Sequence, residues 1–548
     1  MLINLSSTSY LLEKNNNWNY LHAVKSIKFS KYGDIFSLEK GDNISANINL
    51  IFLSDIINFE SVKKYSVEQK KINHILKKIK TKLAINQKPI IVGISSYVYN
   101  NIIESAQNLN IYKKLKFFFL EQLYKLTEKN KNLYIFDIDE IFSLHGIEKC
   151  FDNRNYYLSR CRISSLGIEI IAKSLRKLID RINQANKKVL LLDCDNTLWG
   201  GVIAEDGISK IKIGDEGEGL AFFEFQKAIK KLKNQGVIII LVSKNIKEDV
   251  MKVLKEHRSM VLKEKDISAF KINWLDKSKN IQDISTELSL NMDSFVFWDD
   301  NPVEREKVRI RLKNVEVIEP DADVSNWPKQ LLEYDKFSKF SISKNDYNRT
   351  KQYQIRHKFL TDKKDHKNEI DYLKSIKIKL KIVKINNGNI DRAVQMCQRT
   401  NQFNLSNKRY NHDDITNLNK KDKCFMIHMK DMYGDHGIIS LVCLKFKSEK
   451  ILLLDTFLMS CRVLGRYAEN WILSEILKVA KKNKINKLIA EFIPTKKNDV
   501  AKNFLIENNF KKILTGNKKK FKSIYSNKKT ELFFYDSKEK IKYLNVYA

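Results

Sequence analysis

What this sequence lacks excludes several classes of protein. It has only seven cysteines, an odd number scattered over 548 residues, and they form neither a disulfide framework nor a Cys-x-x-Cys metal site. Residues 1–17 show no basic segment followed by a sustained apolar core, and no apolar run approaches the about 18 residues that span a bilayer. We therefore expect a cytoplasmic protein in a reducing compartment, with no membrane partner.

Proline and glycine are also scarce, whereas Lys, Asn and Ile are over-used. The 99 Lys and Arg residues against 65 Asp and Glu residues give a net charge of +34, which suggests a nucleic-acid partner. However, Lys, Asn and Ile share A/T-rich codons, so the base composition of the gene accounts for the charge. The basic residues form no Arg-rich stripe and no aromatic platform lies among them. We therefore expect no nucleic-acid partner.

The apolar content indicates a globular chain of several domains. Hydrophobic residues make up 43% and aromatic residues 10%, which is enough to bury cores. At about 150 residues per domain, the length predicts roughly three domains. We place the domains at 1–185, 186–340 and 376–548, with a charged, helical linker at 341–375.

In the first domain, apolar segments alternate with amphipathic helical patterns, which predicts a doubly wound α/β fold. The expected strands are IKFS, NINLIFL, PIIVGISS and LYIFDI, and the expected helices lie around 66–86, 110–129 and 164–182. There is no Gly-x-Ser-x-Gly elbow and no Gly-Asp-Ser start. The region resembles a degenerate SGNH-hydrolase-like fold, in which 152–167 would carry an Asp-x-x-His pair, but this segment contains no His. We therefore expect a scaffold or docking role for this domain.

The second domain opens with VLLLDCDNTLWGG at 189–201, where an apolar run ends in Asp193-Cys194-Asp195. Such a run suits a buried parallel strand whose carboxyl end opens into a crevice, where ligands bind in open α/β sheets. Two carboxylates without an intervening Lys or Arg are costly unless a metal or a reaction uses them. Taken alone, the pattern fits an acidic turn equally well.

Later strand ends in this domain favour the site. A helix is expected over 218–234, and the strand GVIIILVSKN then ends at Ser243 and Asn245, where a following helix can cradle phosphate. Lys277 follows the strand-like INW, and SFVFW ends at Asp299-Asp300. Asn301 is expected to cap the next helix, with Pro302 in its first turn. Carboxylates, hydroxyls and an ammonium group are the groups that phosphoryl transfer needs.

The order of these strand ends resembles the haloacid dehalogenase (HAD) superfamily of phosphatases. The resemblance implies a Rossmann-like parallel sheet, with Asp193 as the nucleophile and Asp195 as the general acid and base. It further implies a phosphate site of Thr197, Ser243 and Asn245, charge balance by Lys277, and Mg²⁺ held by Asp193, Asp195, Asp299 and Asp300. Lys271 is an alternative for the lysine role. The gaps between Thr197, Ser243 and Lys277 are largely consumed by the helices of the sheet, so no sizeable cap fits. We expect an open site that suits a substrate tethered to a macromolecule.

The third domain is predicted to have an α+β fold. IKIKLKIVKI reads as a strand, YGDHG as a turn between the strands FMIHM and IISLVCL, and ILLLDTFLM as a strand before a long helix. At that junction, Arg462, Gly465 and Arg466 belong to a loop that can present N–H groups to a pyrophosphate. The region resembles GNAT acyltransferases, although Tyr467 replaces a small residue of their loop and Leu505 replaces their tyrosine acid. These departures argue against a plain acetyl-CoA-dependent N-acetyltransferase and favour a site for a phosphopantetheine arm or another acyl carrier, with CoA as the alternative cofactor.

The phrases LLDCDNTLWGGVIAEDG, FWDDNPVEREKV, TNQFNL, FLMSCRVLGRYAEN and IPTKKN, in this order, resemble the FkbH-like family. The resemblance implies a glyceryl transferase and phosphatase that draws on 1,3-bisphosphoglycerate and loads an acyl carrier protein for polyketide-type biosynthesis. A thiolate would attack the acyl phosphate, and Cys194 and Cys461 are the candidate thiols. Both can equally be packing residues. His436 is a candidate base, although a histidine in a turn is often structural.

Two other hypotheses remain open. One is a bifunctional enzyme of surface-sugar biosynthesis, with a HAD phosphatase and an N-acetyltransferase on one chain, against which Tyr467 and Leu505 argue. The other is a scaffold or carrier-docking protein without activity, against which the complete set of phosphatase residues argues.

Overall fold

In the computed structural model, the chain divides into two compact units, Met1–Ala185 and Asn186–Ala548. The structure describes residues 2–11, 13–22, 26–30, 44–57, 65–86, 88–97, 111–184, 186–340, 344–366, 368–421, 423–448, 450–495, 498–513, 530–536 and 546–547. Of the helices in these ranges, none combines the length and the apolar character that crossing a bilayer requires.

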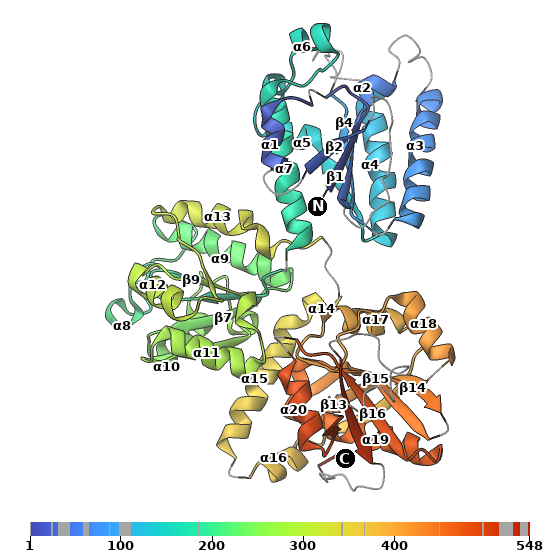
Figure 1. Cartoon of the computed structure of the whole chain (residues 1–548). Helices are drawn as coiled ribbons and strands as arrows, with labels where there is room; N and C mark the ends of the chain where they lie inside the picture. The colour runs from blue at the N-terminus through green and yellow to red at the C-terminus, as the bar shows by residue number, and fades with distance from the viewer. Residues whose placement is uncertain are drawn as a thin grey trace. The chain divides into compact units, whose positions relative to one another are not determined.

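The first unit is built on a sheet of five parallel strands. Its elements are β1 (Leu2–Ser7), β2 (Ser26–Phe29), β3 (Ile44–Phe52), β4 (Ile90–Ser95), β5 (Leu133–Asp137), α1 (Asn19–His22), α3 (Tyr65–Ile85), α4 (Ile111–Lys129) and α7 (Ser165–Asn183). The strand order is β2-β1-β3-β4-β5. Helices α3 and α4 cover one face, and α1 and α7 cover the other (Figure 1). This is the doubly wound arrangement expected for 1–185.

The second unit begins with another parallel sheet. Its elements are β6 (Val189–Leu192), β7 (Ile238–Ser243), β8 (Ala269–Ile272), β9 (Phe295–Trp298), β10 (Glu316–Val317), α8 (Ile203–Asp206), α9 (Gly219–Asn234), α10 (Lys247–Glu256), α11 (Lys277–Leu288), α12 (Pro302–Arg311) and α13 (Trp327–Glu333). The order is β10-β9-β6-β7-β8, so β6 lies at the centre, between β7 and β9. All four residues of β6 are buried, because α9 and α13 pack on one face and α11 and α12 on the other. The carboxyl ends of β6, β7 and β9 therefore meet at one edge.

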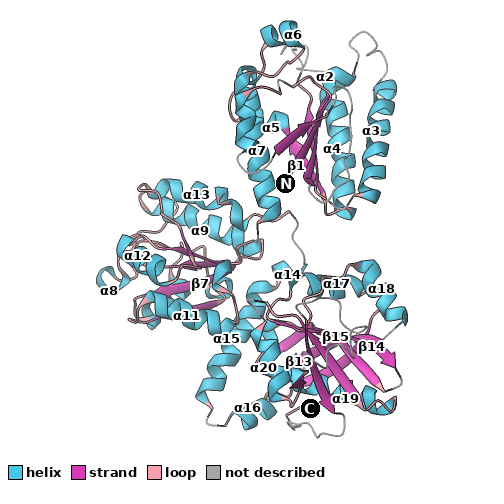
Figure 2. Ribbon diagram, viewed as in Figure 1, coloured by secondary structure: helices cyan, strands magenta, loops and turns pink. Residues whose placement is uncertain are grey.

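The rest of the second unit holds a mixed sheet (Figure 2). Its strands are β11 (Lys379–Lys384), β12 (Phe403–Asn404), β13 (Lys423–Asp431), β14 (Gly434–Ser448), β15 (Ile451–Met459), β16 (Lys487–Phe492), β17 (Lys511–Lys512) and β18 (Glu531–Asp536). β15 and β16 pair in parallel, β12 pairs with the end of β15, and the other strand pairs are antiparallel. Helix α19 (Ala468–Lys482) buries Ile472, Leu473 and Ile476 in the core of this sheet.

Helices α14 (Lys344–Tyr347), α15 (Arg349–Asp365) and α16 (Glu369–Ser375) lie in the segment expected to be a linker. The predicted class, a multidomain α/β protein with a central parallel sheet, is confirmed. Two local predictions were wrong. The strand β1 was not anticipated, and INW is not a strand, because β8 ends at Ile272 and leaves Asn273 and Trp274 in a turn.

Candidate active site

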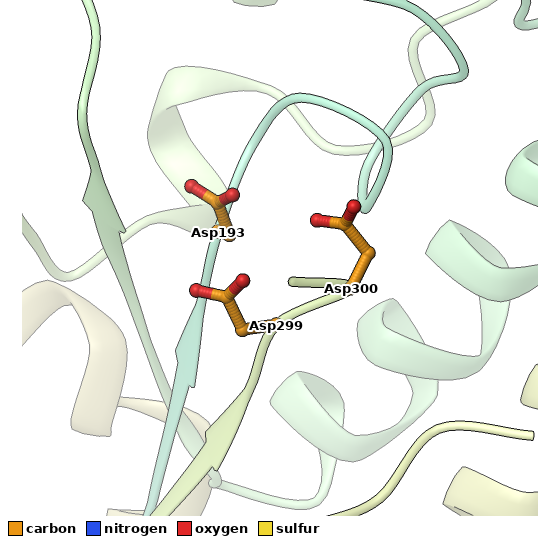
Figure 3. A group of neighbouring side chains, drawn as sticks. All are labelled: Asp193, Asp299 and Asp300. Carbon is orange, nitrogen blue, oxygen red and sulfur yellow. The ribbon is translucent and has the colours of Figure 1, made fainter. Parts of the chain in front are cut away.

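Three carboxylates meet at the carboxyl ends of two neighbouring strands. Asp193 follows β6, and Asp299 and Asp300 follow β9, which pairs with β6 in parallel. One carboxylate oxygen from each lies within 4.8 Å of the others, and Figure 3 shows the three side chains converging. Lys277, the first residue of α11, places its Nζ atom 3.0 Å from Oδ2 of Asp193 and 2.6 Å from Oδ2 of Asp299. The structure thus brings together four of the predicted site residues.

The charges of this cluster do not balance. Burial raises the pKa of Asp299 and of Asp300, and the charge of Asp193 raises both further. Burial alone would lower the pKa of Lys277, but the charges of Asp193 and Asp299 outweigh it, and the pKa is raised. One ammonium group therefore faces three carboxylates. Like charges held this close in a buried site are unfavourable unless a further cation is bound.

A divalent cation fits this donor set. Oδ1 of Asp193 is buried and has no hydrogen-bond partner among the residues that the structure describes. Mg²⁺ takes oxygen ligands and is commonly held by a few carboxylates together with phosphate oxygens. Asp193, Asp299 and Asp300 would hold the ion, which would offset their charge and withdraw electron density from a bound phosphoryl group.

Asp195, which we also expected among the metal ligands, has other partners. Its Oδ1 accepts from the indole N–H of Trp199 at 2.9 Å and from the N–H of Ile203 at 3.1 Å, and its Oδ2 accepts from Nδ2 of Asn245 at 2.8 Å. Burial raises the pKa of Asp195, while the hydrogen bonds from Ile203 and Trp199 oppose this. The carboxyl group is therefore held in place outside the group of three carboxylates, as a positioned acid and base requires.

The loop after β6 is fixed by its own hydrogen bonds. The N–H of Gly201 donates to Oδ1 of Asn196 at 2.8 Å, and the N–H of Asn196 donates to the carbonyl oxygen of Gly201 at 3.2 Å. Gly201 has φ +98°, and a Cβ atom there would lie 2.5 Å from Oδ2 of Asp206. Only glycine satisfies both conditions, so this residue is needed for the turn that carries Asp195.

The predicted phosphate-binding residues lie around the cluster, but two of their side chains have partners within the protein. The Thr197 hydroxyl donates to Oδ1 of Asp300 and accepts from its N–H, both at 3.3 Å. Asn245 binds Asp195, as described above. The Ser243 side chain is buried at the end of β7, where its hydroxyl lies beside the Cys194 thiol. Lys271, the alternative lysine, pairs with Glu287 at 2.8 Å instead of with the cluster.

Arg305 supports the site and was not anticipated from the sequence. Its Nη1 donates to the carbonyl oxygens of Asp299 at 2.9 Å and Asp300 at 2.7 Å, while its Nε binds Glu319 at 2.9 Å. Asn301 caps α12, with Pro302 at its start, as predicted. The first turns of α12 therefore return Arg305 to the strand end that carries the two aspartates. The sequence signal that could have identified Arg305 is a basic residue in the helix that begins directly after the Asp-Asp pair.

The two candidate thiols have different environments. Cys194 is fully buried in the core beneath the site, where burial and the charge of Asp193 raise the pKa of its thiol well above the ordinary value. Cys461 is partly exposed, and its Sγ lies 3.9 Å from the Tyr353 hydroxyl. The guanidinium group of Arg356 donates to the carbonyl oxygen of Cys461 at 2.7 Å. A nucleophilic thiol needs access and a nearby cation, and Cys461 meets both conditions.

The loop expected to bind CoA or a carrier arm is partly covered. Arg466 is fully buried, its Nε donates to Oδ2 of Asp431 at 2.8 Å, and its guanidinium lies over the Phe359 ring at 3.9 Å. Arg462 donates to the Ser460 hydroxyl at 3.1 Å, and Gly465 has φ +87°. Arg462 and Gly465 are thus partly exposed, whereas Arg466 is held inside by Asp431.

Two further residues near this loop bear on its chemistry. Glu469 lies in the first turn of α19, and burial raises its pKa to about 7. A carboxyl group in this position competes with an anion for the helix N-terminus when it is ionised. His436 places Nε2 2.9 Å from Oδ1 of Asp431. This contact gives the histidine a structural partner next to Arg466.

No family model and no curated protein matches the chain. Among solved structures, the chain is similar to the N-terminal part of the protein BF1531 from Bacteroides fragilis, which contains a phosphatase domain complexed with Mg. The match has 25% identity and a TM-score of 0.50, and it covers 61% of this chain and 93% of that one. The fold that carries the aspartate cluster is thus that of a phosphatase domain.

Two other solved structures resemble a smaller part of the chain. An acetyltransferase from Streptococcus agalactiae 2603 has 13% identity and a TM-score of 0.23, covering 29% of this chain and 98% of that one. Rv2747 from Mycobacterium tuberculosis, in complex with CoA and NLQ, has 10% identity and a TM-score of 0.23, covering 28% and 98%.

Proposed function

We propose that this chain is a Mg²⁺-dependent phosphatase coupled to acyl transfer. The observation that carries the proposal is the group of Asp193, Asp299 and Asp300 around Lys277 at one sheet edge. The Mg-bound phosphatase domain of the Bacteroides protein supports it. Bound Mg²⁺ would supply charge neutralisation and polarisation of the phosphoryl group.

Asp193, Asp195 and Lys277 each have a separate role in the proposed reaction. A carboxylate oxygen of Asp193 attacks phosphorus, and the bond to the leaving oxygen breaks as Asp195 donates a proton to that oxygen. Asp195 then takes a proton from water, which hydrolyses the aspartyl-phosphate and releases inorganic phosphate. Lys277 offsets the negative charge that develops during both steps.

For the acyl half, we propose a three-carbon unit taken from 1,3-bisphosphoglycerate. The thiolate of Cys461 attacks the acyl carbon, and the bond from that carbon to the phosphate oxygen breaks, which releases phosphate and leaves a thioester. The thiol on the phosphopantetheine arm of an acyl carrier protein then takes the acyl group. Asp193 removes the remaining phosphate ester. The product would be a glyceryl carrier for polyketide-type biosynthesis, and the exposure of Cys461 beside Arg356 supports this order.

One experiment tests both halves. The protein is incubated with Mg²⁺, 1,3-bisphosphoglycerate and an acyl carrier protein, and enzyme and carrier are followed by intact mass. We expect a glyceryl adduct on the carrier, and a phosphoglyceryl adduct instead when Asp193→Asn is used. No adduct, together with acetyl-CoA turnover and phosphate release from small sugar phosphates, would favour a bifunctional phosphatase and N-acetyltransferase of surface-sugar biosynthesis.

A further inference from the structure

One tryptophan of this chain is placed unlike the others. Four of the six, Trp18, Trp199, Trp298 and Trp327, are at most 4% exposed, and Trp471 is partly buried against the C-terminal core. Trp274 is 68% exposed. An exposed indole leaves a large apolar surface in water, and such surfaces often mark binding sites. The Trp274 side chain therefore contributes little to packing and is free to contact a ligand.

The turn that carries Trp274 is held firmly at the mouth of the aspartate cluster. The N–H of Asn273 donates to the carbonyl oxygen of Ser243 at 3.1 Å, which ties the turn to the end of β7. The Asn273 and Asn280 side chains exchange two hydrogen bonds, at 3.2 and 2.9 Å, which tie it to α11. Lys277 stands three residues after Trp274. The indole is thus carried by a fixed backbone, three positions along the chain from the lysine of the site.

Other exposed apolar residues lie in the segments that follow the neighbouring strands. Leu275 is 57% exposed, Ile246 directly follows Asn245 and is 43% exposed, and Val303 follows the Asp299-Asp300 pair and is 58% exposed. We call Ile246, Trp274, Leu275 and Val303 the apolar rim. Ile246, Trp274 and Leu275 lie in the loops after β7 and β8, and Val303 lies in the first turn of α12, after β9, so these segments stand on both sides of the strand that carries Asp193. The rim therefore borders the phosphoryl site on more than one side.

Within residues 186–340, no inserted domain covers this rim. Between β6 and α9 the only helix is α8, with four residues, and the stretch from β7 to β8 holds α10 and one short turn of helix.

Lys and Arg nearly balance Asp and Glu in residues 186–340, so the excess positive charge of the chain lies elsewhere. Next to the rim, Lys247, Asp276 and Glu304 directly follow Ile246, Leu275 and Val303 in the sequence and carry charges of both signs. A surface of this kind suits a neutral group better than a polyanion or an acidic protein surface.

We propose that the apolar rim binds the neutral, amide-containing pantetheine arm of a thioester substrate, with Trp274 as the specificity residue. This inference rests on the proposed phosphatase and names the part of its substrate that lies outside the phosphoryl site. The face of an indole stacks on flat amide groups and covers methylene groups, and the rim offers further apolar surface. The phosphate of a phosphoacyl thioester would reach Asp193 while its arm lies on the rim.

The test compares two substrates that carry the same phosphate ester, 3-phosphoglyceryl-S-pantetheine and free 3-phosphoglycerate, which has a carboxylate in place of the thioester and its arm. Phosphate release gives kcat and KM for the wild type, Trp274→Ala, Trp274→Phe and the control Tyr347→Ala, which removes an aromatic ring that is 62% exposed outside the rim. We expect Trp274→Ala to raise KM for the thioester about tenfold with little change in kcat, because a remote contact contributes uniform binding. Free 3-phosphoglycerate should change less than twofold, Trp274→Phe should recover most of the loss, and the control should match the wild type.

Other outcomes overturn the inference. An equal loss for both substrates would mean that the substitution displaces Lys277, and an unchanged KM for the thioester would mean that the rim does not contact the arm. A loss seen only with the carrier-bound substrate would place the body of the carrier protein on the rim. If the wild type releases no phosphate from either substrate, the proposed function fails. The inference is then decided by whether pantetheine alone quenches tryptophan fluorescence in the wild type but not in Trp274→Ala.

Discussion

The Nζ atom of Lys277 lies 2.6 Å from Oδ2 of Asp299, and both side chains are almost fully buried. The same ammonium group lies 3.0 Å from Asp193, so it links the end of β6 to the end of β9. Since three carboxylates surround it, Lys277 contributes to folding as well as to chemistry. The stability of the site therefore depends on the positive charge of Lys277.

Replacing Lys277 should therefore damage both activity and stability. In Lys277→Ala, the buried carboxylates lose their cation, which costs about 3–5 kcal/mol in the free energy of unfolding without Mg²⁺. Loss of a group that stabilises the transition state should lower kcat by about 10²–10³-fold. Lys271→Ala is the matched control, because Lys271 pairs with Glu287 away from the cluster. Urea unfolding and phosphate release measure the two effects, and equal behaviour of the two variants would contradict the assignment.

Arg305 gives a second prediction, on positioning. Because its guanidinium holds the carbonyl oxygens of Asp299 and Asp300, Arg305→Ala leaves both buried oxygens short of a donor. We expect a loss of about 2–4 kcal/mol in stability and a weaker response of the melting temperature to Mg²⁺. Arg309→Ala is the control, since Arg309 is half exposed and its ion pairs among the described residues are those with Glu306 and Glu319. A normal Mg²⁺ response in Arg305→Ala would show that the aspartates hold their positions without it.

The strand ends of the central sheet were predictable because parallel strands gather their carboxyl ends at one edge. Asp193 and Asp299 could be placed together on that ground, whereas Lys277 was expected after the segment INW, which is not a strand, and lies instead at the start of α11. The hydrogen-bond partners of the side chains could not be predicted in this way. Thr197 binds Asp300, and the Asp195 carboxylate accepts three hydrogen bonds from its own domain, because buried polar atoms take the nearest donor. No periodicity in the sequence shows which donor that is.

Other failures had a different physical origin. β1 was missed because LINLSS is short and ends in polar residues, yet it is buried between two neighbouring strands. Arg466 reads as an exposed loop cation in the sequence, but Asp431, which lies far from it along the chain, holds it in the core. Tertiary partners of this kind decide burial, and a local pattern does not contain them.

The Asp431–Arg466 pair leads to a prediction on pH. Burial alone would raise the pKa of Asp431, but the hydrogen bond from His436 and the charge of Arg466 hold it below its usual value. An aspartate with a depressed pKa contributes stability above the unfolded value of about 3.9, and this contribution is lost as the pH falls through the folded value. Asp431→Asn should be less stable at neutral pH. It should also lose less stability than the wild type between about pH 6 and pH 3.

Urea unfolding across this pH range measures the effect. Asp435→Asn serves as the control, because the Asp435 side chain is 49% exposed and its partners are solvated, so its contribution should be smaller. Parallel pH profiles for the wild type and Asp431→Asn would show that the carboxyl group of Asp431 does not govern acid unfolding.

The two cysteines of the acyl-transfer proposal can be separated by reactivity. Cys461 is partly exposed, whereas Cys194 is buried beside Asp193, which raises the pKa of its thiol and keeps it protonated near neutral pH. We expect iodoacetamide to label Cys461 well before Cys194, as peptide mass mapping would show. With 1,3-bisphosphoglycerate, Cys461→Ala should lose the acyl-enzyme adduct and Cys194→Ala should keep it. The reverse result would move the nucleophile into the strand that carries Asp193, and both chemical steps would then take place at the aspartate cluster.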